Sequence, residues 1–206
     1  MSIQRENFAA VIFLHELDTQ CALFNNSIAY LKNAAMRQTN RKKGIYDDKK
    51  YPPIEIIAQC TVCLSSLSTI RRILFPCDRE KNKHKTSTQR QNILNRCISL
   101  MELLGNPIFK YINSPIVRNA WEHIDENIDN YLTNSNYTEI SPIYIVGDSE
   151  PSQNTLALKL FNTNDLSISF ANKTISLRNC ISEIKILSEC IQSALYRLNN
   201  GAYPVY

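Results

Sequence analysis

The stretch from residue 114 to residue 132 constrains the fold of this chain more than any other part of the sequence. It opens with Ser114 and Pro115, an N-cap residue followed by proline at the first helical position, where the missing N–H does no harm. At about 100° per residue, its apolar side chains fill one continuous arc of a helix. These residues are Val117, Ala120, Trp121, Ile124, Ile128, Tyr131 and Leu132. The pattern predicts an amphipathic helix whose apolar arc packs on a core.

The polar arc of the same helix carries Arg118, Asn119 and His123 in the spacing R-N-x-x-x-H. This spacing resembles the motif of the HEPN family. Residues 71–76 (RRILFP), 101–105 (MELLG) and 123–126 (HIDE) resemble a group of bacterial HEPN-like proteins in the same order. The resemblance implies a HEPN-like helical fold, a homodimer, and a metal-independent endoribonuclease, a class that often serves as a toxin or a defence effector.

The three motif side chains suit the cleavage of RNA without a metal ion. The ordinary pKa of histidine suits His123 to take a proton from the ribose 2′-OH or to give one to the leaving 5′-oxygen. The forked guanidinium of Arg118 can hold the phosphate and stabilise the charge of the transition state. Asn119 precedes His123 by one helical turn and can orient it or contact the ribose. Because one helix supplies one histidine, the resemblance implies a composite cleft between two protomers.

The same residues also have a purely structural interpretation as a solvated helix face. Arg118 then pairs with Glu122 and His123 bonds to Asn119, and each such pair stabilises a helix by only about 0.2–0.5 kcal/mol. The polar arc further carries carboxylates that would repel RNA phosphate: Glu122, Asp125, Glu126 and Asp129. They favour an alternative function, a catalytically silent HEPN-like module that binds a protein partner or RNA. An antitoxin-like or scaffold role is a third hypothesis.

Two charged loops, one before and one after the second predicted helix, supply further candidates for RNA contact. Lys42 and Lys43 belong to the first loop, and Lys81 and Lys83 to the second. The formal net charge of +4 permits a nucleic-acid partner without requiring one. Plain solvation of lysine-rich loops is the competing and commoner interpretation.

Helical periodicity accounts for most of the chain, and strand-like alternation appears only near its end. Apolar spacing predicts helices over residues 7–37, 54–75, 89–104 and 179–198 besides the one described above. Residues 156–161 and 166–170 flank a turn-rich link and predict a β-hairpin. We therefore expect one mainly α domain over residues 1–206, with a HEPN-like bundle (1–135), a β-hairpin region (140–177) and a C-terminal helix (178–199) that packs back on the bundle.

The seven cysteines show neither a zinc-site pattern nor a disulfide framework. Cys60 and Cys63 form a C-x-x-C inside an apolar helical stretch, without a second pair at zinc spacing. The N-terminus lacks the pattern of a signal peptide, and no run reaches the roughly 18–20 apolar residues of a membrane span. We expect a cytoplasmic protein with reduced thiols, no metal, no cofactor and no membrane association. Its expected partners are RNA, a second copy of the chain, and an antitoxin or other protein.

Overall fold

The computed structural model of the chain describes residues 3–45, 51–76, 86–114, 128–129, 139–147, 151–152, 154–170 and 173–200. The helices in these ranges are α1 (Ile3–Lys42), α2 (Pro53–Leu74), α3 (Ser87–Leu103) and α6 (Leu177–Asn199). The strands are β1 (Glu139–Val146), β2 (Thr155–Asn162), β3 (Ser167–Phe170) and β4 (Lys173–Ser176).

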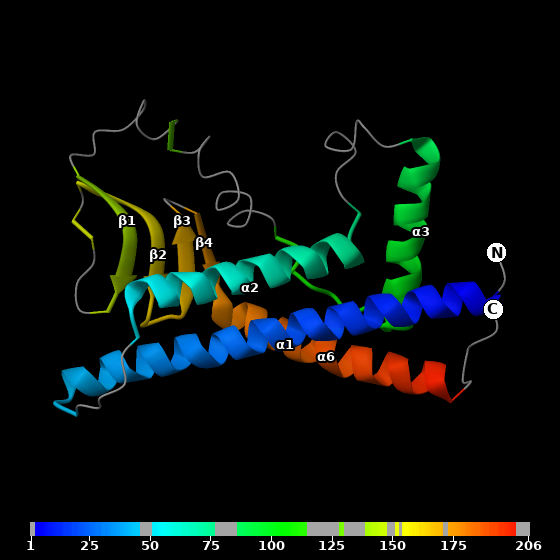
Figure 1. Ribbon diagram of the computed structural model, residues 1–206, viewed down its shortest axis with the longest axis horizontal. Coiled ribbons are helices and arrows are strands. Elements are labelled where there is room, and N and C mark those ends of the chain that lie inside the picture. Colours follow the sequence, from blue (N-terminus) through cyan, green and yellow to red (C-terminus); the bar gives the residue numbers. More distant parts are fainter. Residues whose placement is uncertain are drawn as a thin grey trace.

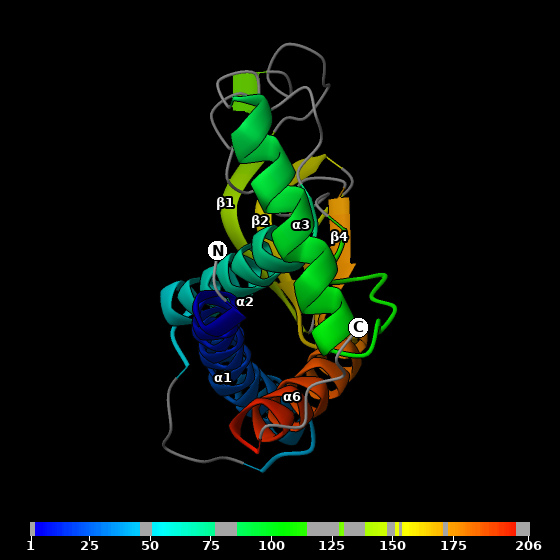
Figure 2. The ribbon, with the colours of Figure 1, turned by 90° about the vertical axis from the view of Figure 1, so that its right-hand side faces the viewer.

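The 40-residue helix α1, roughly 60 Å long at 1.5 Å per residue, forms the base of the molecule. It packs against α2 and α6, which run along its length (Figure 1). The sheet stands beside one end of α2 and α3 stands beside the other. Viewed from the end, α3 and the sheet rise from the same side of the crossed pair α1 and α6 (Figure 2).

The helix ends follow the local sequence signals. Pro53 occupies the first turn of α2, and Thr86 forms a capping box with Gln89 at the start of α3. Gly105, at a φ of +83°, follows the C-cap of α3, where a side chain would be strained. The predicted helices are thus confirmed for these segments, and α1 extends further than predicted, to Lys42.

The expectation of a mainly α bundle is wrong, because the described chain contains a four-stranded mixed sheet of order β1-β2-β3-β4. The predicted hairpin exists as β2 and β3, in which Phe161 lies opposite Ile168. It is extended by β4 on one side and by β1 on the other, and β1 runs parallel to β2. Local alternation identifies a hairpin, but it carries no information on which further strand joins its edge or in which direction. The fold is therefore mixed α/β with helix predominating.

Sheet and helices share one hydrophobic cluster. Phe24 of α1, Phe161 of β2 and Phe170 of β3 are fully buried in it. The helical spacing of apolar residues that predicts α6 is confirmed. Its central apolar side chains are fully buried, and Ile181, Leu195 and Leu198 pack at the margin of the cluster. The shared cluster holds the sheet against α1, α2 and α6.

In the described part of the chain, α2 is the one helix that is long and apolar enough to cross a membrane. Half of its most apolar window is buried inside the fold. Length and composition alone are weak evidence for a membrane span, and the burial of α2 supports a role in the core.

Candidate functional site

The motif residues Arg118, Asn119 and His123 lie outside the described residues. Further along the predicted motif helix, Ile128 and Asp129 are described, and both are α-helical. Ile128 is partly buried against the hydrophobic cluster, and Asp129 is exposed. At these two positions the structure agrees with the predicted apolar and polar arcs.

The loop that leads from α3 to the motif helix is fixed by a carboxylate of α6. Glu183 accepts hydrogen bonds from three consecutive backbone N–H groups, those of Lys110, Tyr111 and Ile112. The four N···O distances lie between 2.7 and 3.0 Å. Glu183 is only 8% exposed. The backbone N–H groups replace the hydrogen bonds that its carboxylate loses when it leaves water. We call residues 104–114 the connecting loop and this contact the Glu183 clamp.

Apolar burial and a second hydrogen bond reinforce the clamp. Phe109 and Ile112 of the connecting loop are 5% and 1% exposed and belong to the hydrophobic cluster. Arg71 of α2 donates its Nε–H to the carbonyl oxygen of Asn113 at 2.9 Å. The chain therefore reaches Ser114, the predicted N-cap of the motif helix, from a fixed position beside the end of α2.

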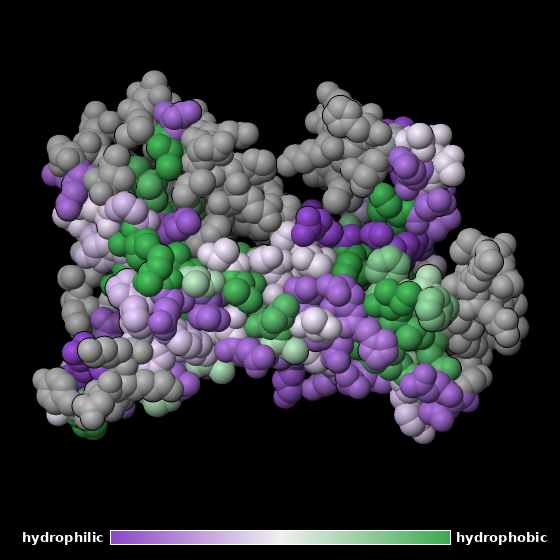
Figure 3. All heavy atoms as spheres, viewed as in Figure 1, coloured by the Kyte–Doolittle hydropathy of each residue, from purple (hydrophilic) through white to green (hydrophobic). Residues whose placement is uncertain are grey.

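Arginines gather around this position. Arg96 of α3 donates to the carbonyl oxygen of Arg72 at 3.0 Å, and its guanidinium lies over the ring of Phe13 at 5.0 Å. The exposed Arg72 makes a 3.4 Å contact with Thr69. We call Arg71, Arg72 and Arg96 the arginine cluster. Strongly hydrophilic side chains are visible on this face where α2 ends near α3 (Figure 3).

The arginine cluster has the chemistry of a phosphate-binding surface. Guanidinium groups remain charged at all ordinary pH values and present several N–H donors to phosphate oxygens. Sequence reasoning cited Arg71 and Arg72 only for their place in the family resemblance, and it missed Arg96 and Glu183. The usable signal for Glu183 was a carboxylate on the buried stripe of α6, between Cys180 and Leu187, because such a group needs hydrogen-bond donors from elsewhere.

Two of the four predicted RNA-binding lysines, Lys42 and Lys43, belong to the described residues. Lys43 is exposed in the turn after α1, and Lys42 ends α1, with its side chain not described. Both lie at the end of the molecule opposite the arginine cluster, since α2 runs back along α1 (Figure 1). Lys81 and Lys83 lie outside the described residues. The role predicted for the four lysines stays a prediction, and the arginine cluster is a further cationic surface, beside the loop that ends at Ser114.

A small hollow of about 410 Å³ lies near Lys43, between the end of α1 and the start of α2. It is lined by Arg37, Arg41, Tyr51 and Pro52. The guanidinium of Arg37 lies 5.9 Å from the centre of the Tyr51 ring.

The described cysteines are Cys21, Cys60, Cys63, Cys97, Cys180 and Cys190, and no disulfide joins any two of them. Burial raises the pKa of Cys21 to about 11 and that of Cys180 to about 12. It also raises the pKa of Cys60 and Cys63 well above the usual range of a thiol. Thiolates are the form that binds metal, so these thiols are poor ligands. Among the described residues, no group of three or more histidine, cysteine or carboxylate side chains is arranged to hold a metal ion.

Comparison of the chain with known family models, curated proteins and solved structures gives no match.

Proposed function

We propose that the protein is a HEPN-type endoribonuclease that cleaves RNA without a metal ion, as a toxin or defence effector in the cytoplasm. The observation that carries the proposal is the position of the R-N-x-x-x-H motif in the chain. It follows a loop that the Glu183 clamp and Arg71 fix beside the arginine cluster. The described chain before the motif thus ends beside three arginines, whose charges suit the backbone of an RNA.

In this mechanism the arginine cluster binds RNA phosphates, and the motif acts on one of them. His123 takes the proton from the 2′-OH or gives a proton to the leaving 5′-oxygen. Arg118 stabilises the additional negative charge on the phosphorane, and Asn119 orients the imidazole or the ribose. No step requires a metal ion, because the nucleophile is the RNA's own 2′-OH.

The proposal includes a homodimer, since one protomer supplies one motif histidine and one motif arginine. Two motif helices that meet across a two-fold axis would supply an acid and a base to one cleft. Light scattering at the concentration used for cleavage is the direct test, and a monomer that retains full activity would contradict this part of the proposal.

The second candidate is a catalytically silent module that binds an antitoxin, another protein or RNA. The observation in its favour is the acidic polar arc of the motif helix, on which Asp129 is exposed. Four carboxylates in this arc would oppose RNA phosphate, although they would also favour a protonated His123. If the protein is a silent module, no RNA cleavage should depend on His123.

Cleavage of a structured RNA in the presence of EDTA separates the two candidates. We expect His123→Ala and Arg118→Ala each to lower the rate by about two orders of magnitude or more. Circular dichroism of both variants controls for folding, because both side chains lie on the predicted polar arc. Cleavage that disappears with EDTA, or that is equal in wild type and His123→Ala, favours the silent module.

A further inference from the structure

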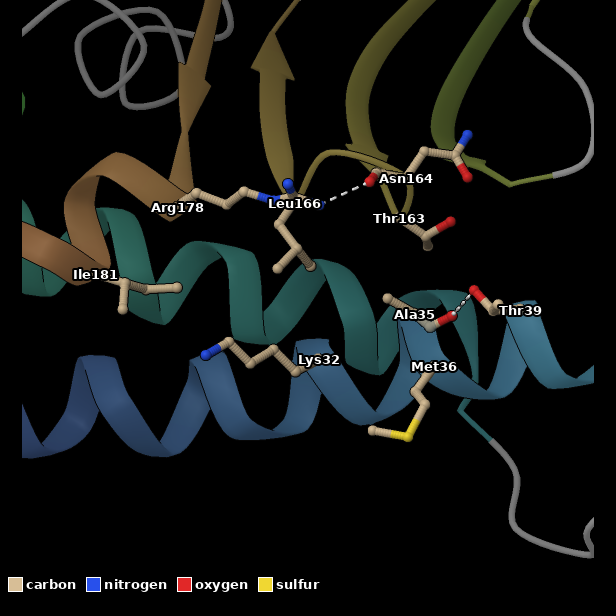
Figure 4. Close-up of a pocket in the computed structure, with 9 residues that line it drawn as sticks. All are labelled: Lys32, Ala35, Met36, Thr39, Thr163, Asn164, Leu166, Arg178 and Ile181. Atoms are coloured by element: carbon tan, nitrogen blue, oxygen red, sulfur yellow. Dashed lines mark hydrogen bonds between the residues drawn. The ribbon is translucent and has the colours of Figure 1, made fainter.

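A groove opens where α1, the start of α6 and the turn between β2 and β3 meet. Its volume is about 560 Å³. Four of its residues lie on one face of α1, two lie on α6, and three lie in the turn (Figure 4). They are Lys32, Ala35, Met36 and Thr39, then Arg178 and Ile181, then Thr163, Asn164 and Leu166. We call this the α1–α6 groove.

The charge of the groove is positive. Lys32 on the α1 wall and Arg178 on the α6 wall are both exposed, and no carboxylate is among the lining residues. Asp165 lies in the same turn without lining the groove. Arg178 donates one N–H to the carbonyl oxygen of Asn164 at 3.0 Å, which fixes the guanidinium and leaves its other donors for a ligand. An ammonium and an oriented guanidinium on opposite walls suit a phosphate group.

The turn that carries this arginine contact is held rigidly. Thr163 donates both its backbone N–H and its hydroxyl to the carbonyl oxygen of Val146, at 3.0 and 2.8 Å. Leu177 donates its N–H to the carbonyl oxygen of Leu166 at 2.9 Å. Leu166 itself has a φ of +55°, a left-handed conformation that is unfavourable for a branched apolar side chain. In this conformation the side chain of Leu166 lines the groove.

The remaining walls are apolar. Ala35, Leu166 and Ile181 line the groove together with Met36, which is 58% exposed. A free inorganic anion would contact the two cations and leave the apolar walls in water. A ligand with a phosphate and a planar apolar group would contact both the cations and the apolar walls. A volume of about 560 Å³ falls within the range of roughly 300–1,000 Å³ that is typical of small-molecule sites.

We propose that the α1–α6 groove binds a nucleotide, with its phosphate between Lys32 and Arg178 and its base against Ala35, Leu166 and Ile181. The same chemistry is offered by a free nucleotide and by the 5′-phosphorylated end of an RNA strand. The proposal does not rest on the cleavage mechanism, since it uses none of the motif residues.

Isothermal titration with AMP, adenosine and a 5′-phosphorylated tetranucleotide tests the groove. AMP should bind at least tenfold more tightly than adenosine. Arg178→Gln and Lys32→Gln should each weaken AMP binding about tenfold, in line with the loss of about 1.4 kcal/mol from a charge-assisted contact. Arg90→Gln, which removes an exposed arginine of α3 outside the groove, is the matched control and should bind AMP as the wild type does.

The positive charge of the groove has its own test. Met36→Glu should lower AMP affinity strongly, because its carboxylate lies one helical turn from Lys32 and can pair with the ammonium that holds the phosphate, and Met36→Gln should lower it less. Both substitutions are at an exposed position, so folding is retained. If the tetranucleotide binds more tightly than AMP, an RNA end is the ligand; the reverse order identifies a free nucleotide. The proposal is overturned if none of these ligands binds at millimolar concentration, or if binding is unchanged in Arg178→Gln.

His123→Ala separates this inference from the proposed function. Nucleotide binding should be unchanged in His123→Ala, because the groove does not include the motif. Loss of cleavage with retained AMP binding supports both proposals. Retained cleavage in His123→Ala contradicts the mechanism alone, whereas parallel loss of AMP binding in a folded His123→Ala protein contradicts the independence of the groove.

Discussion

Helices α6 and α3 flank the candidate site, and they contribute to it in opposite ways. On α6, residues such as Ile184, Leu187 and Ile191 are fully buried, whereas Cys97 and Leu100 are the buried residues of α3. The connecting loop follows α3 directly in sequence, yet its backbone is held by Glu183 of α6. A segment remote in sequence therefore fixes the connecting loop at residues 110–112, whereas α3 bonds to the first residues of the loop, as in Asn106 N–H to the carbonyl oxygen of Met101.

The largest expected effect comes from removing the clamp. Glu183→Ala leaves three backbone N–H groups without their acceptor, including that of the buried Ile112, and should lower the free energy of unfolding by about 3–5 kcal/mol. For a chain of this size that corresponds to a melting temperature about 10 °C lower. Glu189→Ala, at an exposed position of the same helix, should change stability by less than about 0.5 kcal/mol. Equal melting temperatures for the two variants would contradict a stabilising role of Glu183.

Core truncations extend the comparison to packing. Ile191→Ala in α6 should lower the free energy of unfolding by about 2–5 kcal/mol, because Ile191 is fully buried. Ile98→Ala in α3 should lower it by about 1 kcal/mol or less, since 48% of Ile98 is exposed. Urea unfolding of both variants measures the difference. A larger effect at Ile98 would show that α3 contributes more to the core than its exposure indicates.

The thiol of Cys180 makes the stability contributed by α6 sensitive to alkaline pH. Its pKa is raised to about 12 by burial, so it stays protonated in the folded protein when unfolded cysteines ionise near their usual pKa of about 9. Between these values the folded state binds more protons, and the free energy of unfolding should fall as pH rises from about 9 towards 12. Below pH 9 this contribution is fully present. Cys180→Ala should show a shallower decline in urea unfolding between pH 8 and pH 10.5, and an unchanged slope would contradict the assignment.

The smallest effect is expected at the arginine cluster. Arg72→Gln should weaken RNA binding a few-fold and reduce the slope of log K against log salt by about one. Arg90→Gln, in the first turn of α3, should leave both quantities unchanged. Fluorescence anisotropy with His123→Ala protein measures binding without cleavage. Equal salt slopes for Arg72→Gln and the wild type would exclude the cluster as an RNA-contacting surface.

The sequence predicted the parts of this structure that depend on neighbouring residues. The helical periods, the proline at the start of α2, Gly105 after α3 and the hairpin of β2 and β3 are all local patterns. The parallel pairing of β1 with β2 and the Glu183 clamp join segments that are distant or carry no pattern of their own, so both were missed. The R-N-x-x-x-H motif rests on a resemblance in spacing, and because its three side chains lie outside the described residues, its chemical role stays a prediction.

The most direct test of the central claim is the identity of the RNA ends that the protein leaves. Cleavage in EDTA by attack of the 2′-OH must produce a 2′,3′-cyclic phosphate on one fragment and a 5′-hydroxyl on the other, and mass spectrometry distinguishes these ends. We predict cyclic phosphate from the wild type, with its yield at least a hundredfold lower in His123→Ala. Fragments that instead carry a 3′-hydroxyl and a 5′-phosphate would contradict the mechanism, because water and not the ribose would then be the nucleophile.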